Sequence, residues 1–227
     1  MPPNDSTHTP PGYDLRRCDE DTVERLCAAH HGYAGAGRVF FACFAVYEDG
    51  RPVAVYAWKP PPPGAAKSAA PDAPWSVLAL SRMAAIPRGQ RRLNHVSKPL
   101  RRQMRTLLDR GRWPVLLTYH DEGQGHTGHV YKCSGWTPTV RRKATTLTLE
   151  GVRVSRYANG ITRTPEGAVR GETWLQRWEH RACAAGDEAR HMAAAGWVRE
   201  PIPGKVWRSG RQAFRIVRAP AQQSIFG

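Results

Sequence analysis

Residues 75–119 read WSVLALSRMAAIPRGQRRLNHVSKPLRRQMRTLLDRGRWPVLLTY, and this stretch decides the class of fold. The apolar segment 75–85 predicts a strand, 87–92 is a basic turn that contains a glycine, 95–109 predicts a helix, and 113–119 predicts a second, buried strand. The helix is predicted from one apolar stripe, formed by Val96, Leu100, Met104, Leu107 and Leu108. Two strands joined through a helix predict an α/β protein with a central sheet.

The flanking sequence adds elements on both sides of this unit. Asp19–Cys27 predicts a helix that ends at His30, His31 and Gly32, because three acidic residues stand at its start. Residues 39–47 and 52–58 predict a hairpin with Asp49-Gly50 in its turn. The remaining predicted elements are a short helix at 128–134 closed by Gly135, strands at 144–149 and 213–217, and helices at 173–184 and 187–195. This order predicts a mixed central sheet flanked by helices, with a C-terminal helical elaboration.

The length of 227 residues suits one domain. We expect a disordered leader at 1–12 and a single catalytic domain over 13–220. Within that domain, the run KPPPPGAAKSAAPDAP at 59–74 predicts an exposed proline-rich loop, and 170–195 a helical insertion. No apolar run approaches the roughly 18 residues that a membrane span needs. The five scattered cysteines indicate neither a disulfide framework nor a zinc site, and a reducing cytoplasm fits them.

The charge of the chain is one-sided. It has 34 Lys and Arg against 19 Asp and Glu, a formal net charge of +15. Residues 1–80 hold 7 basic and 9 acidic residues, whereas residues 81–227 hold 27 basic and 10 acidic residues, a net +17. Such a field favours capture of a polyanion, and we expect double-stranded DNA as the partner. Simple solubility, or the arginine bias of a GC-rich genome, is the alternative reading.

The segment from Arg82 to Arg112 concentrates this charge, with ten basic residues and one acid, Asp109. Arg101 and Arg105 stand at i and i+4 of the predicted helix, where like charges repel. An anion bound there would relieve the repulsion, and a helix N-terminus after a glycine-containing turn suits phosphate. The phosphates of a nucleic acid or of a cofactor would serve equally, and a solvated basic face is the structural alternative.

The chemically richest segment follows the strand at 113–119. Asp121 stands at the end of that strand as a candidate general base or metal ligand, and Tyr131 is a candidate proton donor or acceptor. His126 and His129 add two imidazoles, a side chain that often serves as a general acid or base. Each alone is as easily a capping aspartate, a core tyrosine or a surface histidine. At the earlier helix end, His31 is a candidate ligand for a borderline metal such as iron, or a residue that caps the helix.

The segment LLTYHDEGQGHTGHVYKCSGW at 116–136 resembles the signature of the Mom family of phage DNA-modification proteins. In that signature a strand ends in S-Y-A-D and continues through G-H-x-G-x-[IV]-Y-[KQ]-A-x-x-W. The matching residues here are Tyr119, Asp121, Gly125, His126, Gly128, Tyr131, Lys132 and Trp136. Weaker elements occur in the family's order and are His30-His31, Leu80-Ser81-Arg82-Met83, Asn94 with Ser97, Gly151 with Ser155 and Arg156, and Lys205.

The resemblance implies a core like that of the GNAT acyltransferase superfamily. It also implies transfer of a small acyl or carbamoylmethyl-type group to the N6 amine of DNA adenine, which protects DNA from restriction in the cytoplasm of a bacterial host. The base would have to be exposed, by flipping, before its amine could react. Two alternatives stay open: a GNAT N-acetyltransferase acting on a small-molecule or protein amine, and a non-catalytic DNA-binding protein. The oligomeric state is left open, a dimer included.

The resemblance also assigns expected roles to residues. Asp121, Tyr131 and Ser97 are expected to be catalytic, and Arg88, Gly89, Asn94 and Ser97 to bind acetyl-CoA or a related acyl donor. The usual pyrophosphate motif of the superfamily has two glycines and residues 88–93 supply one, so the donor is left open. His31 is the candidate metal ligand. The residues expected to contact DNA are Arg91, Arg92, Lys98, Arg101, Arg102, Arg105, Lys132, Arg141, Arg142, Lys143 and Arg156.

Overall fold

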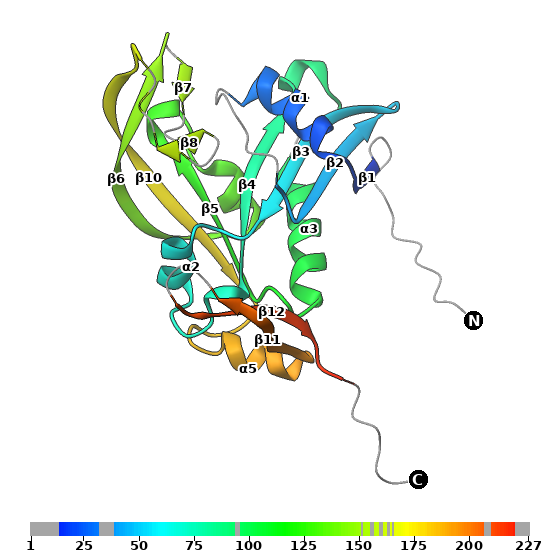
Figure 1. Cartoon of the computed structure of the whole chain (residues 1–227). Coiled ribbons are helices and arrows are strands. Elements are labelled where there is room, and N and C mark those ends of the chain that lie inside the picture. The colour runs from blue at the N-terminus through cyan, green and yellow to red at the C-terminus, as the bar shows by residue number, and fades with distance from the viewer. Residues whose placement is uncertain are drawn as a thin grey trace, which may run out of the picture. The chain divides into compact units, whose positions relative to one another are not determined.

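The computed structural model describes residues 14–31, 39–93, 96–150, 152–154, 157–158, 161–162, 164, 166–206 and 210–220. Helices and strands are mixed along the first half of the chain, and β6 to β10 then follow one another without a helix among the described residues (Figure 1). The strands are β1 (Asp14–Arg17), β2 (Ala42–Glu48), β3 (Arg51–Lys59), β4 (Val77–Ala85), β5 (Val115–Asp121), β6 (Thr137–Leu149), β7 (Val152–Val154), β8 (Tyr157–Ala158), β9 (Ile161–Thr162), β10 (Val169–Arg181), β11 (Trp197–Val206) and β12 (Gln212–Arg218). The α-helices are α1 (Glu20–His30), α2 (Pro63–Ala69), α3 (Ser97–Asp109), α4 (His129–Ser134) and α5 (Glu188–Ala194), and the short 3-10 helices are η1 (Pro74–Ser76), η2 (Arg88–Gln90) and η3 (Glu122–Gln124).

Eight strands form one sheet in the order β1-β2-β3-β4-β5-β10-β6-β7. The strands β1 to β5 lie side by side in chain order. Strand β10, the last of the eight along the chain, is inserted between β5 and β6. Two further pairs, β11-β12 and β8-β9, are separate. The order of elements predicted for residues 75–119 is confirmed, and so is the hairpin turn, since Asp49 and Gly50 both have positive φ between β2 and β3.

The chain divides into two compact units. The first draws on residues 1–59, 79–103 and 117–180, and the second on 60–78, 104–116 and 181–227. All of β1, β2, β3, β6 and α1 belong to the first unit, and α2, α5, β11 and β12 belong to the second. Within the described residues, no helix is long and apolar enough to span a bilayer.

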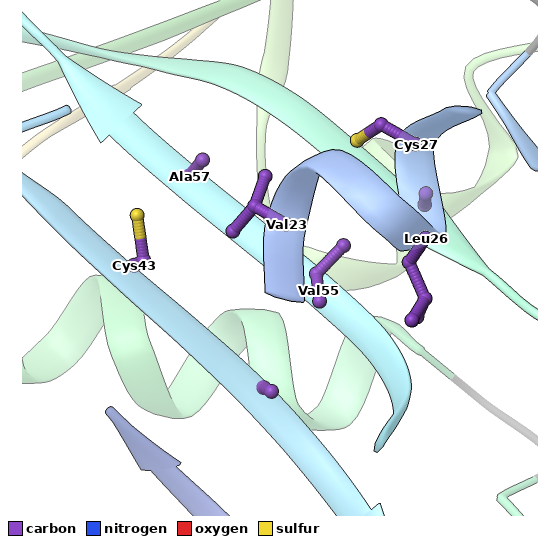
Figure 2. Packing of buried hydrophobic residues seen from close by; sticks show 8 residues of the cluster. Val23, Leu26, Cys27, Cys43, Val55 and Ala57 are labelled. Carbon is purple, nitrogen blue, oxygen red and sulfur yellow. The ribbon is translucent and has the colours of Figure 1, made fainter. Parts of the chain in front are cut away.

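Helix α1 packs on the first half of the sheet. Asp19 caps it by accepting a 2.7 Å hydrogen bond from the backbone N–H of Thr22. Its buried face carries Val23, Leu26 and Cys27, which pack against Cys43 and Ala45 of β2, Val55 and Ala57 of β3, and Ala84 of β4 (Figure 2). Full burial of a valine or leucine side chain contributes roughly 1.5–3 kcal/mol. This cluster fixes the C-terminal end of α1, where His31 lies.

Two sequence predictions are wrong in this fold. Residues 173–184 do not form a helix, because 169–181 are β10, which pairs with β6 through ten residues. Its charged Arg177 and Glu179 are buried as an ion pair at 2.8 Å. Residues 59–74 are not wholly a loop, since α2 begins where the proline run ends and buries Ala66 and Ala69. Proline is compatible with a first helical turn, and the alanines that follow favour a helix.

The C-terminal elaboration therefore contains one short helix, α5, followed by the hairpin of β11 and β12. The helix predicted at 187–195 and the strand predicted at 213–217 are confirmed by α5 and β12. Strand β1, which pairs with β2, was not predicted. The leader expected at 1–12 lies outside the described residues.

Candidate functional site

The turn after β5 is organised around Asp121. This buried carboxylate caps η3, where its Oδ1 accepts a 3.0 Å hydrogen bond from the backbone N–H of Gly123 and a hydrogen bond from the hydroxyl of Thr173 on β10. The Gly123 N–H also lies 3.0 Å from the Thr173 hydroxyl oxygen. Asp121 thus joins the end of β5 to β10 and fixes the start of the glycine-rich loop. Its expected role as a general base stays a prediction beside this positioning role.

His120 lies next to Asp121 and is held by Trp178. The indole Nε1–H of Trp178 donates a 2.8 Å hydrogen bond to His120 Nδ1, so the neutral imidazole carries its proton on Nε2. Burial lowers the pKa of His120, and the charge of His126 lowers it further while Glu122 opposes the shift. His120 is therefore an uncharged, oriented ring at the end of β5.

Tyr131 lies on α4, between two left-handed glycines that start and end this single-turn helix, Gly128 and Gly135. The helix predicted at 128–134 is confirmed. The Tyr131 ring lies 5.9 Å from that of Trp178 and 6.0 Å from that of Trp136, and Trp136 stacks on Trp58 at 6.3 Å. Burial raises the pKa of Tyr131, against an opposing hydrogen bond with Thr118. The phenol is therefore protonated at neutral pH and suited to donate a proton rather than to accept one.

His31 follows the last turn of α1 and is the most strongly shifted histidine among the described residues. Burial, the charge of Arg82 and the charge of His126 lower its pKa from 6.5 to about 4. Arg82 is paired opposite Ala57 in the β3–β4 ladder, so the side chains of Arg82 and Ala57 lie on the same face of the sheet. Ala57 packs against α1, so this is the face that α1 covers. His31 Nδ1 is buried and has no hydrogen-bond partner among the described residues. A neutral imidazole has one ring nitrogen without a proton, and that nitrogen can accept a hydrogen bond.

The turn after β4 was expected to bind the phosphates of an acyl donor. Here the Glu48 carboxylate accepts the backbone N–H of Arg92 at 2.8 Å and that of Leu93 at 2.6 Å. Two amides that could face an anion are therefore already bound to a carboxylate, whose charge repels phosphate. A pocket of about 630 Å³ beside them is lined by Glu48, Asp49, Arg51, Gly89, Gln90, Arg91 and Arg92. At these two amides the turn does not fit a pyrophosphate.

The other residues of the expected donor site are only partly described. Arg88 and Gly89 form the exposed 3-10 turn η2. Ser97 is the first residue of α3, and its backbone carbonyl accepts a 3.2 Å hydrogen bond from the Ser134 hydroxyl on α4. Asn94 lies outside the described residues. The structure therefore brings Ser97 close to α4, which carries Tyr131, without testing their expected roles.

The residues expected to contact DNA fall into groups. Lys98, Arg101, Arg102 and Arg105 are exposed on α3, and Lys132 is exposed on α4. Arg91 is half-buried and its Nε donates a 2.9 Å hydrogen bond to the carbonyl of Ile86, which holds the turn rather than an external anion. The Arg92 side chain pairs with Asp49 at 2.7 Å. On β6, the exposed side chains are those of Arg141, Arg142 and Lys143, and Arg156 lies outside the described residues.

No group of three or more His, Cys, Asp or Glu side chains in the described part of the chain is placed to hold a metal ion. His31 has one histidine within electrostatic reach, His126. The iron site expected at His31 stays a prediction that the described ligands do not support.

Sequence reasoning did not assign site roles to Arg82, His120 and Trp178. Arg82 had a readable signal, because it is a charged residue inside the otherwise apolar strand VLALSRMAA. Trp178 had none, since it lies in a segment taken for a helix and meets His120 only through the pairing of β10 with β5.

Comparison with known proteins places this geometry in context. The family model described as the Mom protein family matches residues 13–191. No curated protein matches the chain. Among solved structures, the ribosomal-protein-S18-alanine N-acetyltransferase from Escherichia coli is similar, with 12% identity and a TM-score of 0.50, over 77% of this chain and 97% of that one. At this identity the likeness shows the fold, and the GNAT-like mixed sheet predicted from the sequence is confirmed.

Two other similar structures have lower TM-scores. One is an IAA acetyltransferase from Bacillus cereus, with 10% identity and a TM-score of 0.47, over 74% of this chain and 99% of that one. The other is an acetyltransferase from Bacillus subtilis in complex with CoA, with 10% identity and a TM-score of 0.43, over 76% and 99% of the two chains.

Proposed function

Because this chain belongs to the Mom protein family, we propose that it is a transferase that attaches a small acyl or carbamoylmethyl-type group to a DNA base. The proposed acceptor is the N6 amine of adenine, and the proposed consequence is resistance of the DNA to restriction, in the cytoplasm of a bacterial host. The observation that carries the proposal is the family match over residues 13–191, which includes His31, Arg82, Asp121 and Tyr131.

His31 is proposed to receive the attacking amine. The exocyclic amine of adenine is a poor nucleophile whose protons become acidic only as its new bond forms. A neutral imidazole can hold one of these protons by a hydrogen bond to its unprotonated ring nitrogen and so orient the lone pair of the amine. Arg82, whose charge helps to keep His31 neutral, is suited to stabilise negative charge that develops on the transferred group.

Tyr131 is proposed to act as the acid. Its phenol is protonated at neutral pH, so it has a proton to donate to the leaving group as that group departs, and burial, which raises its pKa, makes it a weaker acid than a solvated tyrosine. Asp121 is proposed to act mainly by position, since its carboxylate holds Gly123 and Thr173 and so sets the path of the loop that carries His126. Ser97, at the start of α3, is kept as a proposed contact to the donor.

Acetyl-CoA or a related acyl donor is the cofactor that the fold suggests, and CoA is present in the Bacillus subtilis structure. When bound, such a donor supplies an activated acyl group. The Glu48 carboxylate on the Arg92 and Leu93 amides argues against a pyrophosphate at that position. We therefore route no step through CoA, and the donor is a separate question from the acceptor.

The proposal is tested by the DNA of cells that make the protein. Plasmid recovered from such cells should resist endonucleases whose sites contain adenine, whereas plasmid from cells making the Tyr131→Phe variant at equal level should be cut. Complete cutting of both plasmids would contradict the proposed function.

A second candidate is an N-acetyltransferase acting on a protein or small-molecule amine. Its support is the Escherichia coli enzyme with the same fold, which is named for the alanine of a ribosomal protein. Turnover of acetyl-CoA on a free amine, unaffected by DNA, would favour it. The net charge of +15 favours the DNA proposal, since a free amine substrate is itself cationic.

A further inference from the structure

The ribbon of β6 and β10 carries an exposed aromatic side chain, Trp174. The two strands run side by side in Figure 1, and Trp174 pairs opposite Lys143. Trp174 keeps 36% of its surface exposed, although a tryptophan gains more than most residues from burial. Part of this indole is therefore open to solvent on the surface of the sheet.

Two cations accompany this indole. The guanidinium carbon of Arg141 lies 4.1 Å from the Trp174 ring centroid, and Lys143 Nζ lies 5.7 Å from it. The Arg141 side chain is held in place, because its Nε and Nη2 both donate hydrogen bonds to the Glu122 carboxylate, at 2.9 and 2.8 Å. The planar guanidinium is thus held against the indole by a bidentate pair. Indole and guanidinium together make a rigid, flat ledge, and Lys143 beside it pairs with Glu172 at 3.6 Å.

The ledge is connected to the candidate site. Glu122, which anchors Arg141, follows Asp121 in sequence, and Thr173, which precedes Trp174, donates to Asp121. Arg142, between the two cations, lies 5.9 Å from the ring centroid of Tyr119 at the end of β5. Because successive side chains of a strand point to opposite faces, Trp174 and Lys143 lie on the other face of the ribbon from Thr173 and Arg142. The Glu122–Arg141 pair is therefore what joins the ledge to the loop that follows Asp121.

The surrounding charge says which molecule. Residues 137–177 contain eight Lys and Arg and three Glu, a net +5. Flat aromatic and guanidinium surfaces stack on nucleobases, and basic side chains pair with the phosphates between them. We propose that the ledge of Trp174, Arg141 and Lys143 stacks on an unpaired nucleobase of the DNA. This inference rests on the proposed function, since it supplies the surface that receives a displaced base.

The test uses the full-length protein and two fluorescent oligonucleotides of equal length and charge. One is single-stranded oligodeoxyadenosine, and the other is the same chain with abasic residues throughout. Because stacking on an aromatic side chain is worth roughly 1–3 kcal/mol per base, the wild type should bind the adenine oligonucleotide about tenfold more tightly than the abasic one. Trp174→Ala should remove most of that difference and leave the affinity for the abasic oligonucleotide unchanged. Trp174→Phe should restore much of the difference.

Phe214→Ala is the matched control, because Phe214 is also 36% exposed and lies 3.8 Å from the guanidinium carbon of Arg199. It should leave the adenine preference unchanged. Equal wild-type affinity for the two oligonucleotides would overturn the proposal. So would a loss of affinity in Trp174→Ala and Trp174→Phe that is equal for the adenine and the abasic oligonucleotide. Competition by polyglutamate as strong as that by oligodeoxyadenosine would overturn it as well. This binding test is independent of the test of the proposed transfer. If DNA in cells were unmodified, the transfer would be contradicted, but a preference of the protein for the adenine oligonucleotide could still be measured.

Discussion

A methyl group placed on Gly128 would lie 2.4 Å from Cζ2 of Trp178. The same methyl group would lie 2.7 Å from the His120 ring, which Trp178 holds by its hydrogen bond. Gly128 also has φ of +69°, where a side chain is strained. Gly128→Ala should therefore lower the free energy of unfolding by roughly 2–4 kcal/mol, from backbone strain and overpacking together, as measured by urea denaturation.

Gly125→Ala separates these two causes. Gly125 has φ of +71°, but nothing lies within 4 Å of a methyl group placed there. Its substitution should cost only the strain of the left-handed backbone, about 1 kcal/mol. Equal destabilisation by the two alanines would contradict the packing described around Trp178.

Acidification should weaken the fold through the histidines. The pKa of His31 is lowered from 6.5 to about 4, so between these values the unfolded chain binds more protons than the folded one. The stability that neutral His31 contributes is complete above pH 6.5 and is lost as the pH falls toward 4. The pKa values of His120 and His126 are lowered in the same direction. The urea midpoint should therefore fall from pH 7 to pH 5.

His31→Gln tests the largest part of this effect, because glutamine keeps a polar side chain and does not titrate. The fall in midpoint between pH 7 and pH 5 should be smaller in the variant than in the wild type. An identical fall would mean that His31 is not the buried neutral group described here.

Tyr131→Phe and Asp121→Asn test the assigned chemistry. Each keeps the shape of the side chain, and each should lower DNA modification by about 10² or more if the group acts in proton transfer. Thr173→Val removes the hydroxyl that binds Asp121. If Asp121 acts by position, Thr173→Val should reproduce much of its loss without changing the pH dependence of modification. Full activity in Asp121→Asn and Tyr131→Phe would contradict both roles.

DNA affinity should fall steeply with salt. If about six phosphates are contacted, the association constant should drop by a factor of roughly 10³ between 50 and 200 mM salt. Fluorescence anisotropy with a duplex measures this directly. An affinity that does not depend on salt would remove DNA from the account.

Much of the fold was readable because its signals are local. The apolar stripe of 95–109 and the D-G turn at Asp49-Gly50 predicted α3 and the β2–β3 hairpin near their observed bounds. The position of Asp121 at a strand end was likewise predicted from its immediate neighbours. Such features depend on the spacing of adjacent residues, which a sequence displays.

The rest depends on pairing across the chain. Residues 169–181 carry Glu, Gln and Arg in numbers that favour a helix, and only their place between β5 and β6 makes them a strand. The Trp178–His120 hydrogen bond joins residues 58 positions apart, and Glu48 reaches the Arg92 amide across 44. Tertiary contacts of this kind outweigh local propensity and are not written in any one segment.

The central claim is that this protein adds a small group to a DNA base. The most direct test is mass spectrometry of nucleosides from plasmid DNA of cells making the wild-type protein, compared with cells making Tyr131→Phe. We predict a deoxyadenosine of increased mass in the wild-type sample, whose fragmentation places the added group on the base, and its near absence in the variant. Plasmid DNA that contains only the ordinary nucleosides, from cells with abundant folded protein, would contradict the claim.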